Sequence, residues 1–201
     1  MTEFRIYIEG GGDTASQKQE LRLGFQAFFR ELSDRARDRG HTLQVILCGD
    51  RASTFRDFRT ALRTNRSAVN ILLVDAEGPV MMTPWAHLAA RDGWNNPGVP
   101  DDVCHLMVQT VEAWLVADPD ALKDYYGQGF RRNVLPHRHD VEDIPKANLL
   151  PALERASEQT SKGRYRKIQH CADLLKRLNV AAVRGRAEHC ERLFDTILAQ
   201  L

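Results

Sequence analysis

Two similar stretches decide the fold, FRIYIEGGGD at residues 4–13 and NILLVDAEGP at residues 70–79. Each is a short apolar and β-branched run that stops at acidic residues and glycine, which is typical of a buried strand followed by a turn. In an open α/β sheet, ligands bind outside the carboxyl ends of the strands. We therefore expect Glu9, Asp75 and Glu77 to lie together at one edge of a sheet.

The rest of the chain alternates predicted strands and helices. Further strands are predicted at residues 42–47 and 103–109. A helix capped by Asp13 or Thr14 should end at Gly40, and a second helix is expected at residues 53–65. Connections of this length join parallel neighbours. The pattern predicts an α/β fold with a mostly parallel sheet, helices on both faces and a helical C-terminal part.

The predicted division of the chain is a core at residues 1–126 and a helical extension at residues 127–201 that packs on it. Within the core, residues 78–102 contain four prolines and three glycines together with Trp85 and Trp94. Long irregular segments in compact domains are uncommon and tend to be functional. We interpret this segment as a structured lid.

The composition excludes several function classes. Lys and Arg number 28 and Asp and Glu 27, so the formal net charge of +1 indicates no global field for nucleic acid or a membrane. The four cysteines lie far apart in the sequence, which argues against a zinc site and against a disulfide framework. No apolar run approaches the roughly 20 residues of a membrane span, and no signal peptide is evident. We expect a cytoplasmic protein with reduced thiols and no membrane partner.

The three strand-end acids favour a metal site. Carboxylates held close together repel one another unless a cation neutralises them. Side chains two apart on an extended backbone point the same way, so Asp75 and Glu77 can face one ion. All-oxygen ligands suit Mg²⁺ or Mn²⁺, and metal-assisted phosphoryl chemistry follows from such a site. The alternative is that these acids are ordinary turn and capping residues.

The glycines after the first strand have a competing interpretation. Gly10-x-Gly12-x-x-Ala15 is similar to a dinucleotide-binding fingerprint. Glu9 and Asp13 would bring negative charge to the phosphates, which counts against it. No Gly-Lys-Ser/Thr follows, so a P-loop is excluded.

Basic side chains provide candidate contacts to a nucleic-acid backbone. The run at residues 162–167 combines cations with one aromatic residue, a plausible phosphate contact with a stacking platform, or else a solvated loop. Its candidate binding residues are Lys162, Arg164, Tyr165, Arg166 and Lys167. Arg56, Arg59, Arg63 and Arg66 form a helical stripe that we interpret as an exposed face.

The acidic motifs resemble the Toprim arrangement of a Glu followed by an Asp-x-Asp pair, which is found in topoisomerases, primases and OLD-family nucleases. More closely, the chain resembles an uncharacterised Toprim-like family of bacterial proteins. This resemblance rests on five segments that cover nearly the whole chain: IYIEGGGD at 6–13, LLVDAEGP at 72–79, ARDGW at 90–94, VEAWL at 111–115 and KGRY at 162–165.

The resemblance implies a Toprim-like fold and a site role for each acid. Glu9 would be a general acid/base or a metal ligand, and Asp75 and Glu77 would be ligands, although Glu77 stands where Toprim proteins usually have Asp. Glu112 matches no Toprim position. We add it as a further candidate ligand at the end of the fourth strand, or else as a helix-start acid.

The function expected from this resemblance is that of a metal-dependent nuclease, a phosphodiester hydrolase of DNA or RNA. It would serve as the effector of an anti-phage defence system with an AAA- or ABC-type ATPase partner. The alternative is a non-catalytic module of the same fold that binds a nucleotide or a partner.

Overall fold

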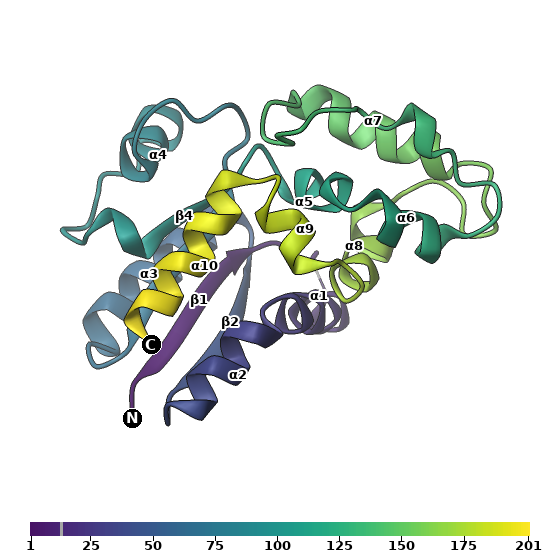
Figure 1. Cartoon of the computed structure of the whole chain (residues 1–201). Helices are drawn as coiled ribbons and strands as arrows, with labels where there is room; N and C mark the ends of the chain where they lie inside the picture. The colour runs from purple at the N-terminus through teal and green to yellow at the C-terminus, as the bar shows by residue number, and fades with distance from the viewer. Residues whose placement is uncertain (13) are drawn as a thin grey trace.

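The computed structural model describes residues 1–12 and 14–201 and has one four-stranded sheet at its centre (Figure 1). The strands are β1 (Glu3–Glu9), β2 (Thr42–Gly49), β3 (Val69–Asp75) and β4 (Cys104–Met107). Their order is β2-β1-β3-β4, and every neighbouring pair is parallel. The predicted α/β class with a parallel sheet, flanking helices and a helical C-terminal part is confirmed.

The register of the strands brings the acidic residues to one edge. Ile8 of β1 pairs with Leu73 of β3, and Asp75 pairs with Met107 of β4. Glu9 therefore lies beside the last residues of β3. The two motifs that define the fold end at the same height in adjacent strands.

The first connection contains two helices rather than one, α1 (Ala15–Phe28) and α2 (Arg30–Asp38). Thr14 caps α1 in a capping box with Gln17, as predicted, while Asp13 lies outside the described residues. The break falls at Phe29. Phe28 and Phe29 are 1% and 0% exposed, and adjacent residues of one straight helix point about 100° apart. A break between the two helices allows both rings to enter the core.

Alternate strand residues pack into two separate cores. On one face, Ile6 and Ile8 contact α1, α2 and α10 (Glu188–Gln200). On the other face, Tyr7 and Leu72 pack with α3 (Arg51–Thr64) and α4 (Pro84–Asp92) (Figure 1). This two-sided burial explains why the strands are apolar almost throughout.

The segment predicted as a lid is ordered and packs on the α3 face of the sheet. It contains α4 and leads into the short 3-10 helix η1 (Asp101–Val103). Trp85 is 4% exposed, and its indole nitrogen donates a hydrogen bond to the Pro100 carbonyl oxygen over 3.3 Å. Both tryptophans of the segment contact Phe55 of α3.

The remaining elements are helical and share the core of the sheet. They are α5 (Val111–Ala117), α6 (Pro119–Tyr126), η2 (Arg132–Val134), α7 (Lys146–Ser157), α8 (Lys167–Leu175), α9 (Val180–Arg184) and α10. Trp114 of α5 stacks on Phe28 at 5.0 Å between ring centroids, and Phe194 of α10 meets Phe28 edge-on at 5.9 Å. None of the described helices combines the length and the apolar character that a membrane crossing needs.

Candidate metal centre

Three carboxylates meet at the carboxyl ends of β1 and β3. One oxygen from each of Glu9, Asp75 and Glu77 lies within 4.8 Å of the other two. Asp75 is only 4% exposed, whereas Glu9 and Glu77 are half-buried. The structure thus brings together the three acids that the sequence predicted as a group, which is a geometry that one cation can span.

The backbone on either side of the cluster has an unusual conformation. Glu77 has a φ of +67°, a left-handed conformation that is uncommon for a residue other than glycine. Its amide donates a hydrogen bond to the Gln109 carbonyl oxygen at 2.7 Å, and the Ala76 amide donates to that of Met107 at 2.9 Å. These bonds hold the chain just beyond β3 in place, at a position where strained backbone often marks a functional site.

The glycine turn after Glu9 closes over the start of α1. Gly11 has a φ of +108°, and a β-carbon there would lie 2.8 Å from Lys18 Cγ. A larger residue is therefore excluded by both conformation and space. The Gly10 amide donates to the Gly49 carbonyl oxygen at 2.7 Å, which ties this turn to the end of β2.

Arg51 at the start of α3 links one of the acids to the lid segment. Its Nη1 donates to Glu9 Oε2 at 2.8 Å and to the Asp75 carbonyl oxygen at 2.7 Å. Its Nε and Nη2 form a bidentate pair with Asp92, the last residue of α4, at 3.0 and 2.7 Å. Such forked pairs fix geometry as well as charge. Arg51 therefore sets the position of Glu9 relative to α4.

Two lysines from the C-terminal part reach the other acids. Lys167 Nζ donates to Asp75 Oδ2 at 3.1 Å and to Glu112 Oε2 at 3.5 Å. Lys146 Nζ forms an ion pair with Glu77, and Arg91 Nη2 lies 3.8 Å from the same carboxylate. Cations of the chain itself therefore contact each of the three clustered acids.

Burial shifts the pKa of two acids of the cluster and of a lysine beside them. Burial raises the pKa of Glu9, the charge of Asp75 adds to the shift, and Arg51 opposes it. Burial likewise raises the pKa of Asp75, even though Lys167 and the Val111 amide favour the carboxylate. For Lys167, burial lowers the pKa, but Asp75 and Glu112 outweigh it and the net pKa is raised. The lysine stays charged, while both acids hold protons more firmly than free side chains.

Glu112 lies beside the cluster without joining it. The residue is 5% exposed at the start of α5, where it accepts hydrogen bonds from Lys167 and, at 3.1 Å, from the Tyr165 hydroxyl. It is not among the acids whose oxygens lie within 4.8 Å of one another in the described chain. Its link to Asp75 runs through Lys167.

The predicted stacking role of Tyr165 is wrong. Its side chain is 1% exposed and packs in the core, so no base can reach the ring. Its amide donates to Ser157 Oγ at 2.7 Å and its hydroxyl donates to Glu112. Tyr165 is a buried support for Glu112, which lies beside the acidic cluster.

The other residues of the basic run do not form one surface. Lys162 lies over the Tyr125 ring at 4.9 Å, and Arg164 pairs with Glu158 at 3.1 Å. Arg166 is exposed just before α8. Lys167 alone among the five candidates contacts the clustered acids. The run was predicted as a unit, and the structure separates it.

Two hollows flank the cluster and share Lys167. A cavity of about 170 Å³ lies on the side of the glycine turn and includes Glu9, Asp75, Phe25 and Ile168 in its lining. A wider groove of about 540 Å³ lies on the side of α7 and includes Glu77, Glu112 and Lys146. The acids thus lie between two spaces, both of which are open to Lys167.

Sequence reasoning missed Arg51, Arg91, Asp92 and Lys146. The available signal was position, since Arg51 comes two residues after the end of β2, and Glu9 ends the neighbouring strand β1. Arg91 and Asp92 were noted as part of a motif, with no role assigned. The partner of Lys146 is 69 residues away in the chain, and no local pattern indicates it.

A family model described as a domain of unknown function, DUF4276, matches residues 8–198. The chain belongs to this family. The matched range includes all the acids and cations of the candidate centre. A search of curated proteins found no match, and neither did a search of solved structures.

The donor set fits a hard divalent ion. All three clustered ligands are carboxylates, and Mg²⁺ or Mn²⁺ prefers oxygen donors and retains water or phosphate in its other positions. Five carboxylates, those of Glu9, Asp75, Glu77, Asp92 and Glu112, face the four cations of Arg51, Arg91, Lys146 and Lys167. With all nine of these groups ionised, one negative charge is in excess among them in this DUF4276 site, in the direction that favours binding a cation.

Proposed function

We propose that this chain is a metal-dependent phosphodiester hydrolase that acts on DNA or RNA. The observation that carries the proposal is the approach of Glu9, Asp75 and Glu77 to within 4.8 Å at the carboxyl ends of two adjacent parallel strands. This edge is where open α/β sheets bind ligands. Three clustered carboxylates, in a site where five carboxylates face four cations, would hold Mg²⁺ or Mn²⁺, as argued above.

A divalent ion at this position would polarise a phosphate oxygen and lower the pKa of a bound water. The chain's own residues would hold and orient the reactants. Arg51 keeps Glu9 directed at the cluster, and Asp75 is fixed by the Val111 amide at 2.9 Å. Lys167 borders both hollows, and its ammonium group can contact a phosphate there.

The Toprim-like relationship is part of the same proposal, as is a role as an anti-phage effector beside an AAA- or ABC-type ATPase. The support for both is the motif resemblance. The order of the acids supports the Toprim element, because a Glu at the end of one strand meets an Asp-x-Glu pair at the end of its neighbour.

One observation favours a second candidate, a non-catalytic module that binds a nucleotide or a partner. Lys146, Lys167 and Arg51 contact the three clustered acids and neutralise most of their charge. A site neutralised by its own chain can be stable without an ion. The two candidates differ in whether a divalent ion binds with an affinity that depends on Asp75.

Calorimetric titration with Mg²⁺ and Mn²⁺ tests the proposal on wild type, Asp75→Asn and Asp173→Asn. Asparagine keeps an oxygen that can accept the Val111 amide, so the first variant removes charge with little change in shape. Asp173 lies on α8 and pairs with Lys176, away from the cluster, which makes its variant a matched control.

Each protein is then incubated with single-stranded DNA, duplex DNA and transfer RNA, with metal or with chelator. Metal binding and cleavage that are lost in Asp75→Asn and kept in Asp173→Asn would support the hydrolase. Metal binding without cleavage of any substrate would favour the binding module. No metal binding by the wild type would refute the metal centre.

A further inference from the structure

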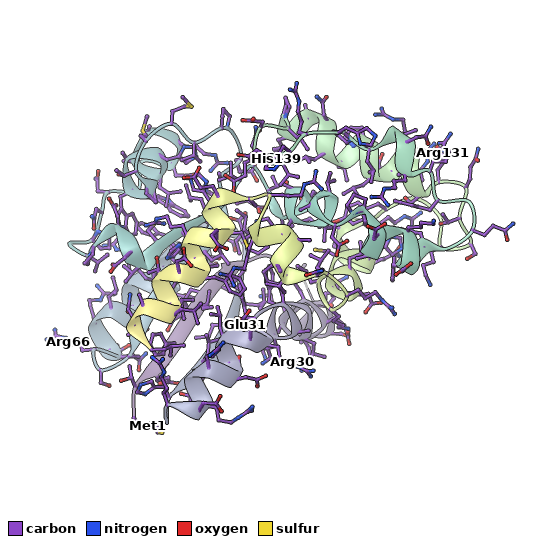
Figure 2. The ribbon with its side chains drawn as sticks, viewed as in Figure 1. Met1, Arg30, Glu31, Arg66, Arg131 and His139 are labelled. Carbon is purple, nitrogen blue, oxygen red and sulfur yellow. The ribbon has the colours of Figure 1, made fainter. Side chains whose placement is uncertain are left out.

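The outer face of α3 carries a row of exposed arginines. Arg56, Arg59, Arg63 and Arg66 are all exposed, and they follow one another at intervals of three, four and three residues. Arg56, Arg59 and Arg63 lie within α3, where residues three and four apart are on the same side, about 5–6 Å from one another. Arg66 lies in the turn just after α3, and Figure 2 shows it at the outer edge of the molecule.

These arginines have little counter-charge. Among the described residues, Asp57 is the only acid that pairs with any of them, over 3.1 Å to Arg56. Arg59 lies 5.5 Å from the centre of the Phe55 ring, and Arg66 Nε donates to the carbonyl oxygen of Arg63. By contrast, Arg51 on the same helix is held by two carboxylates. Arg59, Arg63 and Arg66 therefore present positive charge to solvent with no acid of the described chain paired to them.

A groove lies beside the row, and one of its walls contacts Arg51. A groove of about 370 Å³ runs along α3 and is lined by Ala52, Phe55, Arg56, Arg59, Arg63 and Trp94. It begins one residue after Arg51, whose guanidinium binds Glu9. Trp94 forms its wall, stacked on Phe55 at 4.3 Å, with Arg51 5.0 Å from the ring centre. Arg51 thus contacts both an acid of the cluster and the Trp94 wall of the groove beside the arginine row.

We propose that the outer face of α3 is the track on which a nucleic-acid backbone lies as it enters the metal centre. The helix rises about 18 Å between Arg51 and Arg63, a length along which one strand of B-DNA presents about five phosphates. Phe55 and Arg51 flank the Trp94 ring, so no base stacks on that ring, and binding is to the backbone and independent of sequence.

The role of this track rests on the proposed phosphodiester hydrolysis. The positive charge of the row would, by itself, also suit an acidic protein as the partner. The regular spacing and the groove's start beside the metal centre favour nucleic acid, since the strand gripped there is also the strand to be cut. Binding can be measured without metal, so the track is tested separately from the chemistry.

The test uses a triple variant, Arg56→Gln, Arg59→Gln and Arg63→Gln, in the full chain. Fluorescence anisotropy with labelled single-stranded and duplex oligonucleotides, in chelator, gives the affinity over a series of salt concentrations. The plot of log affinity against log salt has a negative slope, and each lost phosphate contact reduces its magnitude by about 0.7 for single strands and 0.9 for duplex. We expect this magnitude to fall by about 2 and about 3, and binding at 50 mM salt to weaken by about two orders of magnitude.

The matched control is Arg35→Gln, Arg37→Gln and Arg39→Gln, which changes net charge equally on exposed residues of α2 and its C-terminal end, across the sheet from α3. Thermal unfolding verifies that both triple variants fold. Equal losses in the two variants, or a wild-type slope in the α3 variant, would overturn the track. If the α3 triple variant loses binding to polyglutamate but keeps its binding to nucleic acid, the track is overturned in favour of an acidic protein partner. If wild type binds along α3 but cuts nothing with metal, the proposed hydrolysis fails while the track stands.

Discussion

Lys167 and a divalent ion should compete for the same carboxylates, which makes Lys167→Met an informative perturbation. The ammonium group lies 3.1 Å from Asp75 and 3.5 Å from Glu112, both of which are nearly inaccessible to solvent. Methionine keeps most of the stem of the side chain and removes its charge. Without an ion, the variant leaves two buried carboxylates close together with no cation between them.

The magnitude follows from distance and exposure. At an effective dielectric constant of about 20, charges 3.1 Å apart attract by about 5 kcal/mol. The side chain of Lys167 is 46% exposed, so solvent screens this attraction, and desolvation of the pair offsets a large part of the rest. We expect the free energy of unfolding of the metal-free chain to fall by about 1–3 kcal/mol.

Urea denaturation of wild type and variant, in chelator and in 10 mM Mg²⁺, measures this cost. Because the ion would take the place of the ammonium group, Mg²⁺ should stabilise Lys167→Met more than it stabilises the wild type, by a similar 1–3 kcal/mol. Lys162→Met is the control, since Lys162 contacts a tyrosine ring and should lose no more than about 1 kcal/mol. Equal Mg²⁺ stabilisation of wild type and Lys167→Met would refute the competition.

Three other outcomes are expected. The pKa of Asp75 is raised in the folded chain, so the folded chain binds more protons than the unfolded one. The stability that this group contributes is therefore lost as pH rises from about 4 through the folded pKa. Urea titrations should show the stability of metal-free Asp75→Asn, relative to wild type, increasing between pH 4 and 8. Tyr165→Phe removes the hydroxyl donor of buried Glu112 and should cost about 1–2 kcal/mol in urea unfolding, while nucleic-acid affinity in the anisotropy assay stays unchanged; a weaker affinity would restore the stacking role. Gly24→Ala would place a β-carbon 2.8 Å from the Ala172 carbonyl oxygen, so α1 and α8 must separate. This loss of close packing should lower the free energy of unfolding by about 1–3 kcal/mol. A melting temperature equal to that of the wild type would contradict the close packing.

The sheet and the acidic cluster were predictable because their signals are local. Runs such as residues 4–8 and 69–74 are apolar over the length of a strand, and the connections between them are long enough for parallel pairing. Once the strands are parallel, residues that follow them must meet at one edge. Glu9 and Asp75 could therefore be placed together without any knowledge of packing.

Other features depend on contacts that no local pattern encodes. The sequence of residues 162–167 shows how charge is distributed along the chain. It does not show that Tyr165 is buried, because that depends on how α7 and α8 pack against α5. The break at Phe29 likewise follows from the core, since the helical stripe continues through it. Ion pairs between distant elements, such as that of Arg51 with Asp92, are invisible until the fold brings them together.

The counter-charges of the site show why the helical C-terminal part belongs to its chemistry. Lys146 and Lys167 come from α7 and α8, yet they contact Glu77 and Asp75, which follow or end β3. Residues 1–126 alone would keep all five carboxylates and lose two of the four cations. Such a fragment would either protonate its acids or depend on a divalent ion for stability. The predicted division between core and extension therefore passes through the site, and the two lysines couple the packing of the helices to the charge that the acids present.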